Sequence, residues 1–331
     1  MREIPPTRQG ASAPEQRTGS RTGSRTESPT RPRTGPGRFW TLRRQDAFSG
    51  WLFVLPQTLG FLAFVLYPLI AVVYYSFHKS NVLSGVTTYV GTKNYSQLIH
   101  DPATPSVARA TVLFCVGLVV INISLALLLA LLLNQRLRGT TVFRTLFFSP
   151  VVVSLVAWTI TWNFLLQNNG GINALLHAVG IDGPNWLRGD DSALVSVVIV
   201  QVFKNVGLNM VLFLAALQGV PRSLLEAAEI DGAGPWRRFR SVILPMISPT
   251  TLLTTIVTIS GSLQVFAQIQ ILTEGGPDNR TNVLVYFFYQ QAFDNHDFGY
   301  GSAVAVVLFA IILVLTLIQW RLRKKWVFYE S

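Results

Sequence analysis

Charged residues are scarce in this chain, at 13% of 331 positions, whereas 50% of the residues are hydrophobic. Soluble domains carry about 25% charged residues, so this balance indicates a membrane protein. Cysteine is nearly absent, and the single Cys115 excludes an internal disulfide; it lies in an apolar run, where we expect it to pack. The four histidines show no ligand spacing, so no metal site is expected.

Motifs for nucleotide binding and catalysis are also missing. The chain has no GxxxxGKS/T phosphate loop, no glycine-rich dinucleotide fingerprint, no nucleophile elbow and no HExxH motif. We therefore expect no enzymatic activity, no cofactor and no ATP hydrolysis by this chain. None of its sixteen acidic residues falls in a long apolar run. Because proton-driven transporters generally need an ionisable group inside the membrane, any active transport should draw its energy from another subunit.

Residues 1–45 form a basic tail rich in Arg, Thr, Gly, Ser and Pro. Such a segment buries too little apolar surface to offset the entropy of ordering it, so we expect it to be disordered. It lacks the apolar stretch of a cleavable signal peptide.

The rest of the chain, residues 46–328, is predicted to be an all-α polytopic membrane domain with six transmembrane helices. A hydrocarbon core about 30 Å thick takes about 20 helical residues, and six apolar runs are long enough. They are Trp51–Phe77, Ala108–Leu133, Val142–Leu166, Ala193–Gly219, Thr250–Thr273 and Ser302–Trp320.

The basic residues predict the orientation. Most of the 27 Lys and Arg lie in the tail, after the second run, in the loop 221–245 and at the C-terminus. The positive-inside rule then places both termini and the loop 221–245 in the cytoplasm. The net charge of +11 is thus a topology signal and an attraction to anionic lipid, and it does not indicate nucleic-acid binding.

The loop 221–245 is the stretch that a helix bundle would not need merely to stay in the membrane. Residues 224–230 favour a helix, Asp231-Gly232 a turn, and a second helical stretch runs to Pro245. Glycine supplies the positive φ of a turn, and small side chains allow another backbone to approach closely. The pattern predicts a short helix-turn-helix that serves as a docking element at the membrane surface.

This loop resembles the EAA signature of permease subunits in the carbohydrate-uptake class of bacterial ABC importers, the binding-protein-dependent maltose and glycerol-3-phosphate type. The matching residues are Glu226, Ala227, Ala228, Asp231, Gly232, Ala233, Phe239, Leu244 and Pro245. Segments 147–158, 168–181, 272–282 and 292–303 also resemble the family, so the likeness covers residues 45–328.

The resemblance implies an ABC importer type I permease fold in a bacterial inner membrane. It further implies a heterodimer with a related permease, two ATP-binding cassette ATPase subunits and an extracytoplasmic solute-binding protein. The nine matching residues would form a coupling helix that docks in a cleft of the ATPase. In this family, sugar contacts come from the helix before the coupling loop, around residues 202–208, and from the helix after it, around residues 258–265.

Polar residues inside the apolar runs point to a solute pathway, because they are costly unless they face a cavity or each other. Gln201, Asn205 and Asn209 recur every fourth residue, and the pairs Thr258/Ser262 and Gln264/Gln268 are each one helical turn apart. Amides and hydroxyls beside an aromatic ring such as Trp162 suit a sugar, which has polar edges and apolar faces. The alternative for each residue is an inter-helix hydrogen bond worth about 1 kcal/mol.

Lys204 requires separate treatment, because it lies mid-run with no acid in any run. Its partner must be the second permease, a backbone carbonyl or the solute, and an anionic solute such as a glycerol phosphate would fit the last case. Three classes of function therefore stay open: a sugar importer permease, a permease for an anionic polyol, and a self-sufficient secondary transporter.

Overall fold

The computed structural model describes residues 50–80, 85–135 and 139–326. The predicted disordered tail, residues 1–45, lies outside these ranges. The chain divides into two units, Met1–Gly60 and Phe61–Ser331. Residues 50–60 of the first are helical. The arrangement described below is that of the second unit.

Four helices in the described ranges are long and apolar enough to cross a membrane: Gly50–Ser76, Thr104–Leu133, Ser192–Gln218 and Phe298–Leu322. The first contains a π-helical segment η1 (Leu62–Leu66) and α2 (Tyr67–Ser76), and the other three belong to α4 (Thr104–Leu133), α8 (Ser192–Gln218) and α15 (Phe298–Trp326). They correspond to the first, second, fourth and sixth predicted runs. The count reaches six only if two bent helix pairs are each one span.

The third predicted run, Val142–Leu166, is not one straight helix. It is divided between α5 (Thr140–Val152) and α6 (Leu155–Leu166), and the chain bends by 104° between Thr140–Val152 and Leu155–Ala178. Pro150 inside α5 has no N–H, so it cannot donate to the Leu146 carbonyl four residues earlier. The hydroxyl of Ser149 donates to that carbonyl instead. Val153 then adopts extended backbone, and Ser154, with ψ 138°, is also non-helical, which ends the helix.

The fifth predicted run, Thr250–Thr273, is also wrong as a continuous helix. The α12 helix (Ser248–Ser262) stops eleven residues earlier, and α13 (Ala267–Leu272) follows a non-helical segment. Gly261 weakens the last turn by about 1 kcal/mol relative to alanine, and the Gln264 side chain donates to the Ser260 carbonyl at 2.9 Å. Gln264 and Gln268 are therefore not one turn apart on a single helix.

Shorter elements connect the spans. The only strands in the described ranges are β1 (His78–Ser80) and β2 (Thr87–Tyr89), which pair antiparallel with His78 opposite Tyr89, a small exception to the predicted all-α fold. The remaining elements are α3 (Lys93–His100), α7 (Gly171–Ala178), α9 (Arg222–Ile230), α10 (Pro235–Arg238), η2 (Phe239–Ile243), α11 (Leu244–Met246), α14 (Leu284–Tyr289) and η3 (Gln290–Asp294).

The centre of the second unit is the contact between α4 and α8. Phe114 and Leu118 of α4 are fully or almost fully buried, as are Met210 and Phe213 of α8. On its other side α8 approaches α5 so closely at Gly207 that a Cβ there would overlap the Phe147 carbonyl. Small residues allow such backbone contact between membrane helices.

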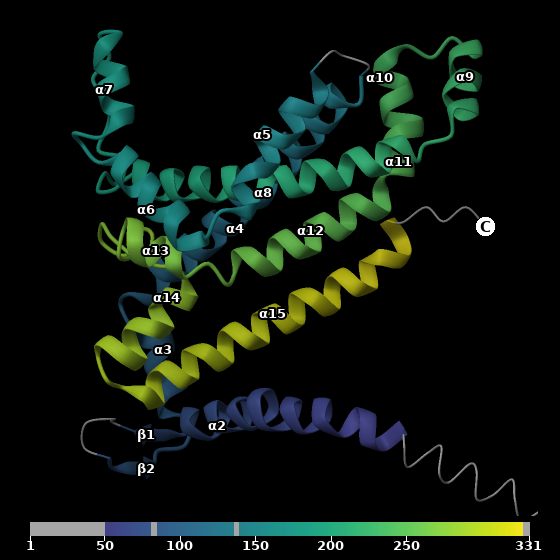
Figure 1. The fold of residues 1–331 in the computed structure, drawn as a ribbon. Helices are drawn as coiled ribbons and strands as arrows, with labels where there is room; N and C mark the ends of the chain where they lie inside the picture. The colour runs from purple at the N-terminus through teal and green to yellow at the C-terminus, as the bar shows by residue number, and fades with distance from the viewer. Residues whose placement is uncertain (1–49, 81–84, 136–138, 327–331) are drawn as a thin grey trace, which may run out of the picture. The chain divides into compact units, whose positions relative to one another are not determined.

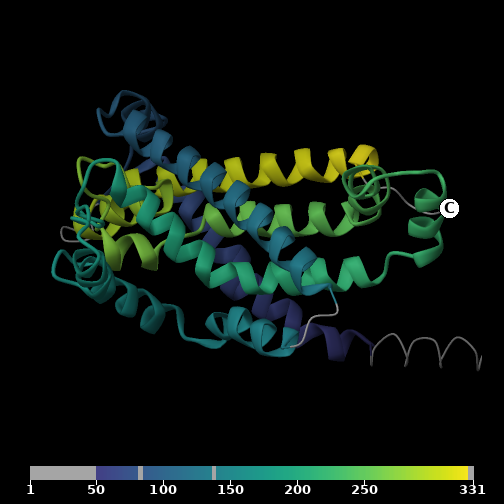
Figure 2. The same ribbon diagram turned by 90° about the horizontal axis from the view of Figure 1, so that it is seen from above.

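The short elements of the second unit lie at the two ends of its long helices. In both views α8, α12 and α15 run alongside one another (Figure 1, Figure 2). The α9–α11 segment lies at one end, and α7, α13, α14 and the β1–β2 hairpin lie at the other.

Candidate functional site

The predicted helix-turn-helix is present at residues 222–246 and ends its first helix in a Schellman motif. Gly232 has φ +72°, its N–H donates to the Glu229 carbonyl at 3.0 Å, and the Ala233 N–H donates to Ala228 at 2.9 Å. These two bonds satisfy carbonyls that the end of α9 leaves free. No atom lies within 4 Å of a Cβ built on Gly232, so its backbone conformation, and not crowding, requires glycine.

The residues of the signature are mostly accessible on this turn. Glu226, Ala227, Asp231, Gly232 and Leu244 are exposed, and Ala228, Ala233, Phe239 and Pro245 are half-buried. Within the turn, Arg238 pairs with Glu229 at 3.0 Å and joins the second helical stretch to α9.

Two exposed apolar side chains that the sequence analysis did not select also lie on the turn. Ile230 is 86% exposed and Trp236 is 71% exposed, with the Trp236 ring stacked 5.6 Å from Phe239. The sequence could have indicated both residues, because they are large apolar side chains among polar residues in a loop. Apolar groups held in the open in this way favour contact with another protein.

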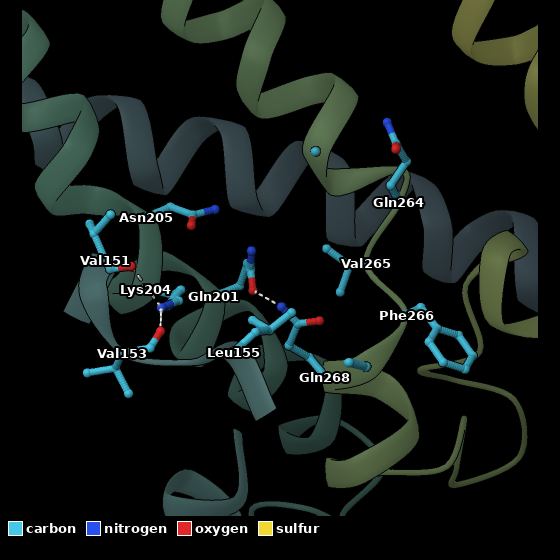
Figure 3. A pocket seen from close by; sticks show the side chains of 12 residues that line it. Val151, Val153, Leu155, Gln201, Lys204, Asn205, Gln264, Val265, Phe266 and Gln268 are labelled. Carbon is cyan, nitrogen blue, oxygen red and sulfur yellow. Dashed lines mark hydrogen bonds between the residues drawn. The ribbon is translucent and has the colours of Figure 1, made fainter. Parts of the chain in front are cut away.

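A pocket of about 670 Å³ lies at the breaks in the third and fifth predicted runs (Figure 3). Five of the nine predicted pathway residues line it: Gln201, Lys204, Asn205, Gln264 and Gln268. Val151, Val153 and Leu155 at the α5–α6 break and Val265, Phe266 and Ala267 between α12 and α13 contribute apolar wall. The pocket thus exists because both runs are interrupted. Of these six wall residues, only Val265 lies in the range 258–265 that the family resemblance implied.

The side-chain amides of the pocket differ in whether they are already hydrogen-bonded to protein. Gln268 Nε2 donates to Gln201 Oε1 at 2.6 Å, and both side chains are buried. Asn205, one turn along α8, makes no side-chain hydrogen bond within the described part of the chain, so its amide is available to a solute.

The ammonium group of Lys204 donates hydrogen bonds to carbonyls at the break between α5 and α6. Nζ donates to the carbonyls of Pro150 and Val153, each at 2.5 Å, and to Val151 at 3.4 Å. It also lies 6.0 Å from the centroid of the Trp158 ring. Of the three partners expected for this charge, the structure shows the backbone carbonyls. A cation at the carbonyl end of a helix is favourable, so Lys204 caps α5.

The other four predicted pathway residues are outside the pocket lining. Asn209 Nδ2 donates to Asn122 Oδ1 at 2.5 Å and to Thr258 Oγ1 at 3.2 Å, so it joins α8 to α4 and α12 inside the bundle. Ser262 donates to the Cys115 sulfur at 3.0 Å. Trp162 packs its ring 5.6 Å from Phe203. For Asn209, Thr258 and Ser262 the inter-helix hydrogen bond is the arrangement observed.

Residues 122–327 match the family of binding-protein-dependent transport system inner membrane components. The chain belongs to this family. The match contains the turn at 222–246 and every residue of the pocket. A permease of this family is a transport subunit whose chain crosses the inner membrane several times.

Several relatives align over nearly their full length. YurN of Bacillus subtilis (strain 168), a probable ABC transporter permease, is 34% identical over 285 residues, covering 85% of this chain and 97% of its own. LacF of Rhizobium radiobacter, a lactose transport system permease, is 36% identical, with 84% and 95% covered. UgpA of Pectobacterium atrosepticum, an sn-glycerol-3-phosphate transport system permease, is 33% identical, with 85% and 97% covered.

A solved bacterial ABC transporter that imports the acidic polysaccharide alginate contains a chain of the same fold. The TM-score is 0.76 at 20% identity, and the alignment covers 87% of this chain and 99% of the other. The likeness establishes the permease fold.

Proposed function

We propose that the chain forms half of the translocation pathway of an ATP-driven importer for a neutral sugar. A second, related permease would supply the other half, a solute-binding protein would deliver the sugar, and two separate ATPase subunits would hydrolyse ATP. The turn at 222–246 would face the cytoplasm, as the basic residues predict, and dock on one of the ATPases.

One observation carries this proposal: the helices on both sides of the docking turn lead to the pocket. The α8 helix carries Gln201, Lys204 and Asn205 and leads to α9, while α12 follows α11 and ends at Ser262, next to Gln264. Asn205 and Gln218, the last residue of α8, are thirteen residues apart, which is about 20 Å of helix. A displacement of the turn would therefore move two walls of the pocket, and ATP binding could favour one of two permease conformers.

The pocket suits a sugar because it combines amides with apolar wall. Asn205, Gln201 and Gln268 offer donors and acceptors for hydroxyl groups, and Phe266 and the valines offer apolar surface to C–H faces. Ligand pockets of about 300–1,000 Å³ with few polar groups are typical of small-molecule sites. LacF, the lactose permease, supports the same class.

An anionic polyol is the second candidate, supported by UgpA, the glycerol-phosphate permease. The contacts of Lys204 disfavour it, because the ammonium group already has three carbonyl partners.

The test is sugar uptake by the importer reconstituted with its partner subunits, binding protein and ATP. Gln201→Ala and Gln268→Ala each remove one amide of the pocket and should lower uptake about tenfold, the effect of about 1.4 kcal/mol. Gln97→Ala, an exposed amide of α3, is the matched control and should leave uptake unchanged. Full uptake by both pocket variants would contradict the proposed pathway.

A further inference from the structure

A continuous row of aromatic rings leads away from the pocket. It begins at Phe266, which stands at the pocket rim with its ring directed away from the Gln201–Gln268 pair (Figure 3). The ring of Tyr289 is 4.8 Å from Phe266 between centroids, and Phe293 is 5.3 Å from Tyr289. These two residues belong to α14 and the π-helical segment η3 that follows it.

The row continues to the β1–β2 hairpin. Phe298 lies 6.4 Å from Phe293, and Tyr75 lies 5.4 Å from Phe298. The last three rings are Tyr74, His78 and Tyr89. The distance between ring centroids is 5.6 Å from Tyr75 to Tyr74, 4.0 Å from Tyr74 to His78 and 5.3 Å from His78 to Tyr89.

The outer end of the row is a second hollow. Tyr74, Phe77, His78 and Tyr89 line a space of about 530 Å³. Tyr74 is 54% exposed and Tyr89 is 73% exposed; His78 lies between them, stacked on Tyr74 and edge-on to Tyr89. The row thus joins two hollows, one at the hairpin and one at the helix breaks.

The exposure of the outer rings distinguishes that part of the row from core packing, whereas Phe266 and Tyr289 at its inner end also pack against the hydrophobic core. None of the eight rings is buried, and Phe293 in its middle is 52% exposed. Rings whose only role was to fill a core would be buried more deeply, because burying an aromatic side chain is what stabilises the fold. Amides of Gln290, Gln291 and Asn295 lie next to Phe293 along the chain, and the hydroxyls of Ser80 and Thr87 lie on the hairpin.

We propose that this row is a carbohydrate-stacking track, with a first site for a sugar ring in the hairpin hollow. A pyranose presents C–H groups on its faces and hydroxyls on its edge, so it can stack on a ring while neighbouring amides bond its hydroxyls. Successive partly exposed rings would let the sugar move from the hairpin hollow to the pocket without leaving a surface that it fits. The inference rests on the proposed function, and it adds a second binding site at the hairpin.

The experiment measures uptake of glucose, lactose and raffinose, which have one, two and three rings, by the complete importer in proteoliposomes. Tyr89→Leu and Phe293→Leu remove one exposed ring each and should lower uptake of the sugar carried about three- to tenfold at low concentration, the range of one stacking contact. Tyr89→Phe and Phe293→Tyr keep the ring and should restore uptake. Phe309→Leu is the matched control, since Phe309 is 48% exposed on α15 and contacts no other described ring.

The outcomes separate the track from the pathway itself. Normal uptake by Tyr89→Leu and Phe293→Leu, together with loss in Gln268→Ala, overturns the track and leaves the proposed function standing. Accumulation of none of the three sugars overturns both. A lower amount of assembled importer in the membrane, with unchanged uptake per complex, would identify the rings as membrane-interface anchors and overturn the track.

Discussion

At the scale of single residues, Lys204 shows how a charge can be held inside a membrane span without an acidic partner. The break after α5 leaves carbonyls without backbone donors, and the ammonium group of Lys204 bonds two at the end of the helix and that of Val153 just beyond it. A charged donor on such groups is worth about 2 kcal/mol, whereas an unpaired carbonyl in a dry site costs a similar amount. The charge and the break therefore stabilise each other.

Lys204→Met should lower the thermal stability of the purified importer, because about 2 kcal/mol of charged hydrogen bonding is lost. Uptake should fall equally for neutral and phosphorylated solutes, because the break forms the pocket wall. Lys204→Arg, which keeps a cationic donor, is the control and should retain more of the stability. A loss restricted to phosphorylated solutes would show instead that Lys204 recognises charge.

Two asparagines one turn apart on α8 provide a matched comparison. Asn209→Leu should destabilise the protein by about 1–3 kcal/mol, because it leaves the buried amide oxygen of Asn122 without a donor. Asn205→Leu should leave stability unchanged and reduce sugar uptake, because Asn205 faces the pocket without a partner among the described residues. Denaturation in detergent and uptake by the assembled importer check the two effects. The same loss of stability in both variants would contradict this division of roles.

At the scale of elements, the breaks in the third and fifth predicted runs and the turn at 222–246 depend on backbone geometry. The breaks bring Val153 and Phe266 to the pocket, and the positive φ of Gly232 sets the direction in which the chain leaves α9. Each feature is a place where the backbone departs from a regular helix, so each should respond to substitutions that change backbone preference alone.

Gly232→Val should strain the turn by about 1–3 kcal/mol, because a β-branched residue disfavours φ +72°. Uptake and solute-stimulated ATP hydrolysis should fall about fivefold or more, while the amount of protein in the membrane stays the same. Gly232→Asn is the control, since asparagine tolerates the left-handed conformation, and it should keep most of the activity. Unchanged coupling in Gly232→Val would rule out the turn as the docking element.

At the scale of the whole molecule, the chain is a subunit of an ABC importer. Its family, the exposed Ile230 and Trp236 on the turn, and the pocket near the middle of α8 fit a subunit that is driven by other subunits. The polar tie through Asn209 holds α4, α8 and α12 together, so these helices should move as a unit.

The chain reconstituted alone in liposomes, with ATP inside, should not accumulate glucose, lactose or raffinose against a gradient. Accumulation should begin only when the second permease, the ATPase subunits and a binding protein are added. Radiolabelled sugar in the liposome lumen measures both cases. Concentrative uptake by the single chain would return the secondary transporter to consideration.

The apolar runs of about 20 residues by themselves determined the membrane class, since length and hydropathy are local properties. Only the structure distinguished the four runs that are continuous helices from the two that are broken. The spacing around Gly232 likewise determined the turn at 222–246, because a helix stop and a positive φ need only neighbouring residues. The pocket was decided by tertiary structure. Whether an amide such as Asn205 or Asn209 faces a solute or a partner helix depends on where α5 and α12 break and on what packs beside α8, which are contacts between residues far apart in the sequence.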